Sequence, residues 1–398
     1  MVPLPNPAAA EPVYLDHNAT TPVDPRVFDA MRPFFLERFG NASSRTHAYG
    51  HAAADAVEAA RSEVARLIAA DPREIVFTSG ATESNNLALK GAARAHREQG
   101  DRLITAATEH KAVLDPCRAL EREGFSVTVL PVGPDGRLEA AAVERAITDR
   151  TILVSVMAAN NEVGVLGPLS EVGRITKAKG VLFHSDAAQA VGKEPLDVDA
   201  LGVDLLSISA HKMHGPKGVG ALYVRRKNPR VRLEPLFDGG GQEGGLRPGT
   251  LDVPGIVGLG KACELSRLEG DAERSRVRRL RERLRERIFS RLDGVRLNGH
   301  PTLRLAGNLN LSFEGVDGQA LLVALKPVAA ISTGSACTTG SIEPSHVLRA
   351  LGVPEPLVHS TIRFGLGRFT TEGDIDRVAD AVVAEVFRLR ARSPFRRS

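Results

Sequence analysis

The alternation of strand-like and helix-like segments over residues 52–224 constrains the fold more than any other feature of this chain. Short apolar runs, rich in β-branched residues, are separated by stretches with apolar residues at helical spacing. The strand-like runs are 75–78, 103–106, 126–130, 151–157, 181–184, 205–208 and 220–224, and the helix-like stretches are 52–70, 83–99, 112–123, 138–147 and 170–179. This alternation predicts an α/β fold with a mostly parallel sheet between helices. In such a fold, a ligand is expected at the carboxyl ends of the strands.

The chain changes character after a glycine-rich segment at 239–249. An arginine-rich helix is predicted over 261–290, and its charges indicate a solvated, ion-paired face rather than a partner site. A strand at 308–313 and helices near 319–325, 345–351 and 373–389 predict an α+β unit. With 398 residues the chain exceeds the usual size of one hydrophobic core. We therefore expect a large ligand-binding domain over 17–262 and a small α+β domain that consists of 263–398 together with residues 1–16.

Composition and charge exclude several classes of protein. The net charge is only +4 and aromatic residues make up 4% of the chain, which disfavours direct binding of nucleic acid. No run of about 18 apolar residues occurs, so no membrane span is expected. The first residues lack the charged and apolar regions of a secretory signal. The three cysteines are too widely spaced for a disulfide framework or a metal cluster, which suits a reducing compartment, and we expect a cytoplasmic protein.

Lys212 occupies an unusual position between two apolar strands. Residues 204–224 read DLLSISAHKMHGPKGVGALYV, so a polar turn carries this lysine just ahead of a Gly/Pro-rich break. Burying a lysine is costly, and one use of a buried lysine is to form a Schiff base with an aldehyde. The alternative is an ammonium group that reaches solvent past an apolar stem. Lys212 alone does not distinguish the two.

Two polar loops at predicted strand ends help to distinguish them. Residues 78–85 (TSGATESN) lie between a strand and a helix, where backbone N–H groups and hydroxyls favour a phosphate; a simple helix cap is the alternative. Asp186, in HSDAAQ, follows another strand and would either cap a helix or keep a pyridinium nitrogen protonated, as pyridoxal 5'-phosphate (PLP) requires. Together with Lys212, these loops indicate a PLP site. No Rossmann fingerprint or Walker loop competes with it.

From about Val13 to Arg368, the chain resembles the cysteine desulfurases of the NifS/IscS type, in the class V aminotransferase group of fold type I PLP enzymes. The resemblance rests on several long motifs in the right order. They are YLDHNATTPVDPRV (14–27), FTSGATESNN (77–86), TEHKAVLDPC (108–117), NNEVGV (160–165), SAHKMHGPKGVGALYVRR (209–226), RPGT (247–250), STGSACTTGSIEPSHVLRALG (332–352) and IRFGLGRFT (362–370). The large domain would then be the PLP-binding one.

The resemblance implies roles for the residues around the cofactor ring. Lys212 would form the Schiff base and then act as the base at the substrate Cα. Asp186 would pair with the ring nitrogen, and Gln189 would hydrogen-bond the ring hydroxyl. His110 would stack on the ring and move protons; a surface or capping histidine is the alternative. Asn161 would contact both cofactor and substrate.

The resemblance also implies how the phosphate and the substrate carboxylate are held. Arg363 would clamp the substrate carboxylate with its forked guanidinium, unless it belongs to a structural ion pair. The phosphate site would combine one subunit of a homodimer with Thr250 of the second subunit. Within one subunit, the phosphate would be bound by Ala81, Thr82, Ser209 and His211.

Cys337 separates this subgroup from other PLP enzymes. It lies in the segment STGSACTTGS (332–341), whose small polar residues cannot pack a core, so an exposed and mobile loop is expected. Cys117 and Cys263 lie among apolar neighbours on predicted helices and are expected to be buried. By resemblance, the Cys337 thiolate would take the sulfur of PLP-bound cysteine and hold it as a persulfide. No resident metal is expected; Cys337 would meet a metal only transiently, through its persulfide, during cluster hand-over.

The predicted activity is the conversion of L-cysteine to L-alanine, with the sulfur passed from Cys337 to an acceptor protein. A selenocysteine lyase, an aminotransferase and a non-catalytic sulfur-delivery protein are the alternatives. Cysteine turnover would distinguish the desulfurase from a selenocysteine lyase. Amino transfer to a keto acid would identify an aminotransferase, and a colourless purified protein would indicate a non-catalytic one. The basic tail (RLRARSPF, 388–395) favours a NifS-like role in nitrogenase cluster assembly. A housekeeping IscS-like role in iron–sulfur cluster assembly or tRNA thiolation is the alternative.

Overall fold

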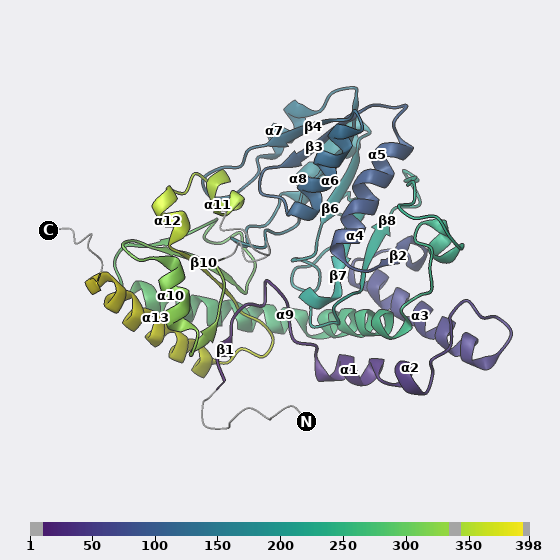
Figure 1. The fold of residues 1–398 in the computed structure, drawn as a ribbon. Helices are drawn as coiled ribbons and strands as arrows, with labels where there is room; N and C mark the ends of the chain where they lie inside the picture. Colours follow the sequence, from purple (N-terminus) through teal and green to yellow (C-terminus); the bar gives the residue numbers. More distant parts are fainter. Residues whose placement is uncertain (1–10, 334–343, 393–398) are drawn as a thin grey trace.

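The computed structural model describes residues 11–333 and 344–392 (Figure 1). A seven-stranded sheet has the strand order β2-β8-β7-β6-β5-β3-β4. Neighbouring strands are parallel except at β8, which runs antiparallel to both β2 and β7. The connection over 210–219 is too short for the crossover that a parallel pair requires, so β8 returns beside β7 in the opposite direction. The strands are β2 (Ile75–Thr78), β3 (Arg102–Ala106), β4 (Ser126–Leu130), β5 (Thr151–Ser155), β6 (Leu182–Asp186), β7 (Leu205–Ser209) and β8 (Gly220–Val224).

Helices cover both faces of this sheet, which confirms the predicted α/β architecture. One face packs on α3 (Ala48–Leu67), α7 (Ala140–Ala146), α8 (Leu169–Lys179) and the first part of α9 (Val253–Phe289). The other face packs on α4 (Ala81–Asn86), α5 (Ala92–Ala95) and α6 (Lys111–Arg122). The π-helical turn η2 (Leu87–Gly91) joins α4 to α5, so the single helix predicted over 83–99 is helical but not uniformly α.

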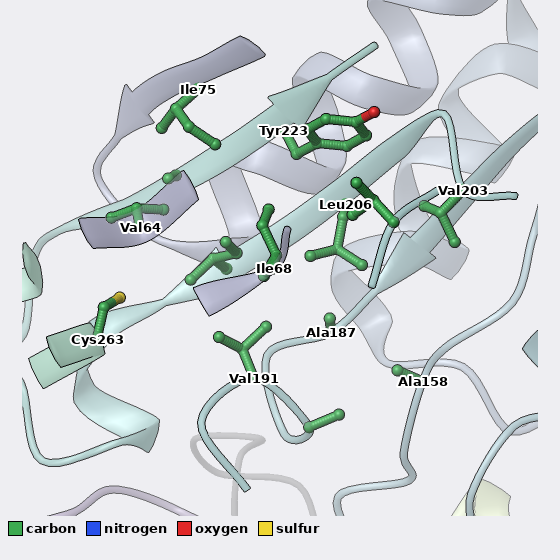
Figure 2. Close-up of a cluster of buried hydrophobic side chains, with 14 of the residues drawn as sticks. Val64, Ile68, Ile75, Ala158, Ala187, Val191, Val203, Leu206, Tyr223 and Cys263 are labelled. Carbon is green, nitrogen blue, oxygen red and sulfur yellow. The ribbon is translucent and has the colours of Figure 1, made fainter. Parts of the chain in front are cut away.

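A hydrophobic core lies on each face of this sheet, and each core contains one of the two cysteines predicted to be buried. Figure 2 shows Cys263 near Val64 of α3 and near Ile68, which follows the last residue of that helix, on the side of the sheet that also carries Ile75. Cys117 lies in the opposite core, where burial raises the pKa of its thiol to about 12. Both are free cysteines that serve as small apolar side chains.

A third core surrounds a three-stranded antiparallel sheet of order β12-β10-β9. The second part of α9, α10 (Gly318–Leu325) and α13 (Glu372–Arg392) pack against it. Its strands are β9 (Val295–Leu297), β10 (Asn308–Phe313) and β12 (Thr361–Gly365). The N-terminal strand β1 (Val13–Tyr14) pairs with β11 (Ala329–Ala330), which brings Val13 and Leu15 into this core. The other elements are α1 (Pro25–Met31), α2 (Pro33–Leu36), η1 (Pro72–Glu74), η3 (Ala210–Lys212), η4 (Gln242–Gly245), α11 (His346–Ala350) and α12 (Glu355–His359).

Helix α9 contributes to one core of the large sheet and to the core of the small sheet, and it runs along both parts of the molecule in Figure 1. It begins at Val253, earlier than the predicted start at 261, because the Asp252 side chain caps it by accepting a 3.1 Å hydrogen bond from the Gly255 N–H. The glycines of its first turns allow close packing: a Cβ at Gly260 would lie only 2.6 Å from the Ala60 Cα on α3. The predicted domain boundary at 262/263 falls inside this helix, and the division into domains stays a prediction.

The charged face of α9 is ion-paired, as predicted. Arg283 binds Asp376 at 2.7 Å and Arg287 binds Asp380 at 2.9 Å, and both carboxylates belong to α13. In the described part of the chain, no helix is long and apolar enough to cross a membrane.

Candidate active site

A cavity of about 480 Å³ opens at the carboxyl ends of β5, β6 and β7, where the sequence predicts the ligand. The loops after β2 and β3 and an N-terminal segment at 18–20 complete its wall. Nine of the residues predicted for the site line this one cavity. They are Ala81, Thr82, His110, Asn161, Asp186, Gln189, Ser209, His211 and Lys212.

Lys212 ends the short helix η3, directly after β7. Its Nζ donates hydrogen bonds to the backbone carbonyls of Asn18 (2.7 Å) and Ala19 (2.6 Å). The ammonium group is therefore held at the cavity wall by the protein. This arrangement favours the Schiff-base interpretation over a lysine that extends to solvent.

Asp186 is the last residue of β6 and is buried, with its carboxylate held from two sides. Oδ2 accepts a 2.7 Å hydrogen bond from the Asn85 side chain, and Oδ1 accepts a 3.0 Å hydrogen bond from the Ala188 N–H. Each oxygen keeps a further lone pair for another donor, such as a protonated ring nitrogen. Asn85 lies within the FTSGATESNN motif, yet the sequence analysis did not assign it a role.

Gln189 is held in one orientation by its neighbours. Its Oε1 accepts hydrogen bonds of 3.3 Å from the Asn18 side chain and from the Lys193 Nζ, and its Nε2 donates to the Asn18 carbonyl at 2.8 Å. Neither Asn18 nor Lys193 was identified from the sequence. The signal for Asn18 was its place in the quoted YLDHNATT segment.

His110 both caps a helix and lines the cavity, so its two predicted roles are combined. As the N-cap of α6, its Nδ1 accepts a 3.1 Å hydrogen bond from the Ala112 N–H. Burial, reinforced by the positive charge of Lys212, lowers the pKa of His110. The neutral ring therefore carries its proton on Nε2, where it is available for transfer.

The part of the cavity where the sequence predicts a phosphate forms where β2 turns into α4. Gly80 has φ +144°, and β8 passes so close that a Cβ at Gly220 would lie 2.6 Å from the Gly80 Cα. The Ser209 Oγ faces the same turn, 3.8 Å from where a Gly80 Cβ would be. His211 donates to or accepts from the Thr20 hydroxyl at 3.1 Å, and burial lowers its pKa to about 4. Neutral His211 would therefore bind a phosphate by hydrogen bonding rather than by charge.

Three predicted residues lie outside this cavity or outside the described residues. Thr250 is exposed, close in sequence to Arg247, whose Nε binds Glu83 of α4 at 3.0 Å. Arg363 is fully buried in β12, a strand that the sequence analysis missed, and its Nη2 pairs with Asp16 at 2.8 Å. This structural ion pair is the alternative considered from the sequence. Cys337 lies outside the described residues.

The described flanks of segment 334–343 both attach beside the cavity. Ser332 pairs with Arg363 through the backbone, and the Arg363 Nη1 donates to the Asn161 carbonyl at 2.9 Å. On the other side, the Ser345 hydroxyl binds the buried carboxylate of Glu162, and the His346 Nε2 lies 3.0 Å from the Glu109 carbonyl. Glu109 directly precedes His110 and Glu162 directly follows Asn161, so these two contacts attach the flank next to two cavity residues.

Comparison with known proteins identifies the class of protein to which this fold and cavity belong. Residues 13–378 match the family described as Aminotransferase class-V, and the chain belongs to this family of PLP enzymes. It is 61% identical, over 96% of its length and 94% of the relative's, to the cysteine desulfurase IscS of Anaeromyxobacter sp. (strain Fw109-5). It is 54% identical to the cysteine desulfurase IscS of Rickettsia rickettsii (strain Iowa), over 96% and 93% of the two chains.

Solved structures show the same fold type I architecture. A NifS-like protein superposes with a TM-score of 0.88 at 38% identity, over 94% of this chain and 99% of that one. A structure of SspA in complex with cysteine superposes with a TM-score of 0.80 at 39% identity, over 90% and 100% of the two chains. The resemblance to the NifS/IscS type is thereby confirmed, and the cofactor is PLP.

The donor and acceptor groups of the cavity fit this cofactor. Lys212 supplies an amine, Asp186 supplies a carboxylate with free lone pairs, and Gln189 presents an amide donor. The glycine turn at the start of α4 supplies backbone N–H groups to the cavity. Ala159 and Met157 form an apolar part of its wall.

Proposed function

We propose that this cysteine desulfurase converts L-cysteine to L-alanine and carries the released sulfur as a persulfide on Cys337. The observation that carries the proposal is the meeting of Lys212, Asp186 and Gln189 in one cavity. Their relative order in the chain and their contacts suit a PLP enzyme, and the relatives at 54–61% identity are named cysteine desulfurases. The nine cavity residues keep the roles that the resemblance implies.

Bound PLP supplies an electron sink for the negative charge that develops at the substrate Cα. Lys212 would hold the cofactor through its Nζ, and the same Nζ would serve as the base for the substrate Cα proton. Asp186 would hold the proton of the ring nitrogen, while Asn85 and the Ala188 N–H keep its carboxylate in place. Neutral His110 provides a proton at Nε2.

Sulfur transfer is a substitution at the substrate sulfur. The Cys337 thiolate forms an S–S bond as the substrate Cβ–S bond breaks, and the electron pair of that bond stays with carbon. Carbon is then protonated, so alanine leaves and the persulfide remains. No external oxidant is needed, because the carbon keeps the electron pair of the Cβ–S bond and is reduced while the transferred sulfur is oxidised to S⁰.

We propose that Asn161 and Arg363 recognise the substrate carboxylate. The two residues are in contact, since the Arg363 Nη1 donates to the backbone carbonyl of Asn161. Asp16 already neutralises Arg363, so carboxylate binding would require the guanidinium to serve both partners. The exposed position of Thr250 supports its predicted role at the phosphate of a second subunit, in a homodimer.

An iron–sulfur scaffold in the cytoplasm is the proposed sulfur acceptor. The relatives named IscS favour the housekeeping role over the nitrogenase role that the basic tail suggested. Under either role, the persulfide on Cys337 is the species that is passed on.

Two variants test the mechanism. Lys212→Ala should lose the visible absorbance of the lysine-bound cofactor. Cys337→Ser should keep that absorbance but form no alanine from cysteine, while the buried-cysteine control Cys117→Ala should keep both. Normal desulfuration of cysteine by Cys337→Ser would show that the mechanism is wrong, and amino transfer to a keto acid would identify an aminotransferase instead.

A further inference from the structure

Lys193 lies behind the wall of the active site and contacts one of its residues. Its Nζ donates a 3.3 Å hydrogen bond to the Oε1 of Gln189. It also lines a second, smaller cavity of about 50 Å³, whose wall includes Lys212. In the described part of the chain, no carboxylate lies within ion-pairing distance of the Lys193 ammonium. The contact with Gln189 is therefore not a by-product of a salt bridge.

The hydrogen bonds around Gln189 agree with only one orientation of its amide. In the observed orientation Oε1 faces two donors, from Lys193 and from the Asn18 side chain, while Nε2 faces the Asn18 carbonyl. Turning the amide by half a rotation would oppose its NH₂ group to both donors and its oxygen to a carbonyl. A protonated ammonium group has three donors and no acceptor, so the charged form of Lys193 disfavours the turned amide.

We propose that Lys193 is a positioning residue. It holds the Gln189 amide so that the Gln189 Nε2 presents an N–H to the ring hydroxyl oxygen of PLP. This inference rests on the proposed role of Gln189. Gln189 lines the main cavity and its Nε2 has a second N–H beyond the one that binds Asn18. Lys193 itself does not line that cavity and acts through the amide.

The surroundings of Lys193 hold its ammonium in place while making its charge costly. The Arg274 Nη1 donates to the Lys193 carbonyl at 3.3 Å, which anchors the backbone. Burial, and then the positive charge of Lys212, lowers the pKa of Lys193 to about 7. Around it, the positive charge of Arg363 has the same effect, and the carboxylates of Glu194 and Glu273 oppose it. A lysine kept in such a place without an ion pair needs another use, and the fixed amide of Gln189 provides one.

The absorbance of the PLP-bound enzyme tests the proposal independently of turnover. A donor to the ring oxygen withdraws charge that would otherwise hold the proton on the Lys212 nitrogen. Lys193→Met should therefore raise the pH midpoint of the visible absorbance by about 0.5–1 unit and weaken PLP binding to the apoenzyme by about 3- to 10-fold. Lys193→Arg, which keeps the donor, should retain more of both properties, and the exposed control Lys179→Met should change neither.

A double-mutant cycle distinguishes positioning from a general structural effect. Gln189→Ala should give the same shift as Lys193→Met, and the double variant should show no further shift. An unchanged midpoint in Lys193→Met, or additive shifts in the double variant, would overturn the role of Lys193. An unchanged midpoint in Gln189→Ala would instead overturn the role of Gln189 as well. If Lys193→Met does not fold, Lys193→Gln, which is neutral and can also accept hydrogen bonds, takes its place with the same expected shift.

Discussion

The Asn85 side chain donates a 2.7 Å hydrogen bond to the carboxylate of Asp186, joining helix α4 to the end of strand β6. Both residues are buried. This bond links the helix proposed to bind the phosphate to the carboxylate proposed for the ring nitrogen. The elements that we propose to hold the two ends of the cofactor are thus connected to each other.

Replacing Asn85 should weaken cofactor binding. Asn85→Ala leaves one oxygen of the buried Asp186 carboxylate without its donor, and a hydrogen bond to a charged group contributes about 1.5–3 kcal/mol. We expect PLP affinity of the apoenzyme to fall by about ten-fold or more, measured by equilibrium reconstitution. The neighbouring control Asn86→Ala removes only a contact with the Thr82 carbonyl and should bind PLP normally. Equal affinities for the two variants would contradict this account.

Removing the charge of Asp16 should destabilise the protein. Arg363 is fully buried in β12, and Asp16→Asn would leave its guanidinium without the counter-ion at 2.8 Å. The expected loss is about 1–3 kcal/mol in the free energy of unfolding, measured with urea. Asp29→Asn, at an exposed position of α1, is the matched control and should be neutral. A stability loss no larger than that of the control would mean that Arg363 depends on its other contacts.

Glu109 should behave as a neutral carboxylic acid. Burial raises its pKa well above the usual value, and the negative charge of Asp186 adds to this effect. Because the folded state holds the proton, this stabilisation is full below about pH 4.5 and is lost as pH rises through the folded pKa. Glu109→Gln should keep the 2.6 Å acceptor for the Met157 N–H and flatten the pH dependence of unfolding over that range.

The comparison with Glu109→Ala makes this test decisive. The alanine variant removes the acceptor and should lose about 1–3 kcal/mol at neutral pH, whereas the glutamine variant should lose less. Glu121→Gln, at an exposed position of α6, controls for loss of a surface charge. A larger loss in Glu109→Gln than in Glu109→Ala would show that the ionised carboxylate is the form that stabilises the fold.

His184 should make the protein acid-sensitive. Its ring is fully buried between the hydroxyls of Ser155 (2.8 Å) and Ser207 (3.0 Å), and burial lowers its pKa to about 3. As pH falls below about 6.5, the unfolded chain takes up a proton at this position and the folded one does not, so stability decreases. Between pH 6.5 and 5 the loss from this side chain is about 1.6 kcal/mol.

The slope of stability against pH isolates this contribution. His184→Asn should show a smaller loss of unfolding free energy between pH 6.5 and 5 than the parent protein, whatever its stability at pH 7. The exposed control His359→Gln should keep the parent slope. An unchanged slope in His184→Asn would mean that His184 is protonated in the folded protein.

Residues with a strong local pattern could be predicted, and those that act across the fold could not. Lys212 follows an apolar strand and precedes a Gly/Pro-rich break, and Asp186 ends another strand. Both positions therefore predict a cavity at the same edge of a parallel sheet. Asn18 and Lys193, by contrast, acquire a role only through their contacts with Gln189. The motif around Asn18 marks that segment, but neither residue's neighbours in the chain indicate a contact with Gln189.

The same distinction applies to the fold. The strands at 75–78, 126–130, 220–224 and 308–313 match the predicted ranges because period and composition define them locally. The early start of α9 was missed because its glycines read as a loop, and only packing against α3 makes them favourable. Strand β12 was missed because an arginine stands at its centre, and only the ion pair with Asp16 makes that arginine compatible with burial.

Local sequence by itself determined the α/β class, the edge of the sheet at which the cavity lies, and the lysine and aspartate that we propose for the PLP site. These depend on the order of apolar and polar residues along a strand and the turn that follows it. Tertiary structure alone decided which side chains hold those residues in place, as Asn85 holds Asp186 and the Asn18 and Ala19 carbonyls hold Lys212. The physical reason is that a hydrogen bond between distant segments depends on how the sheet and helices pack, and the spacing of residues along the chain carries no record of it.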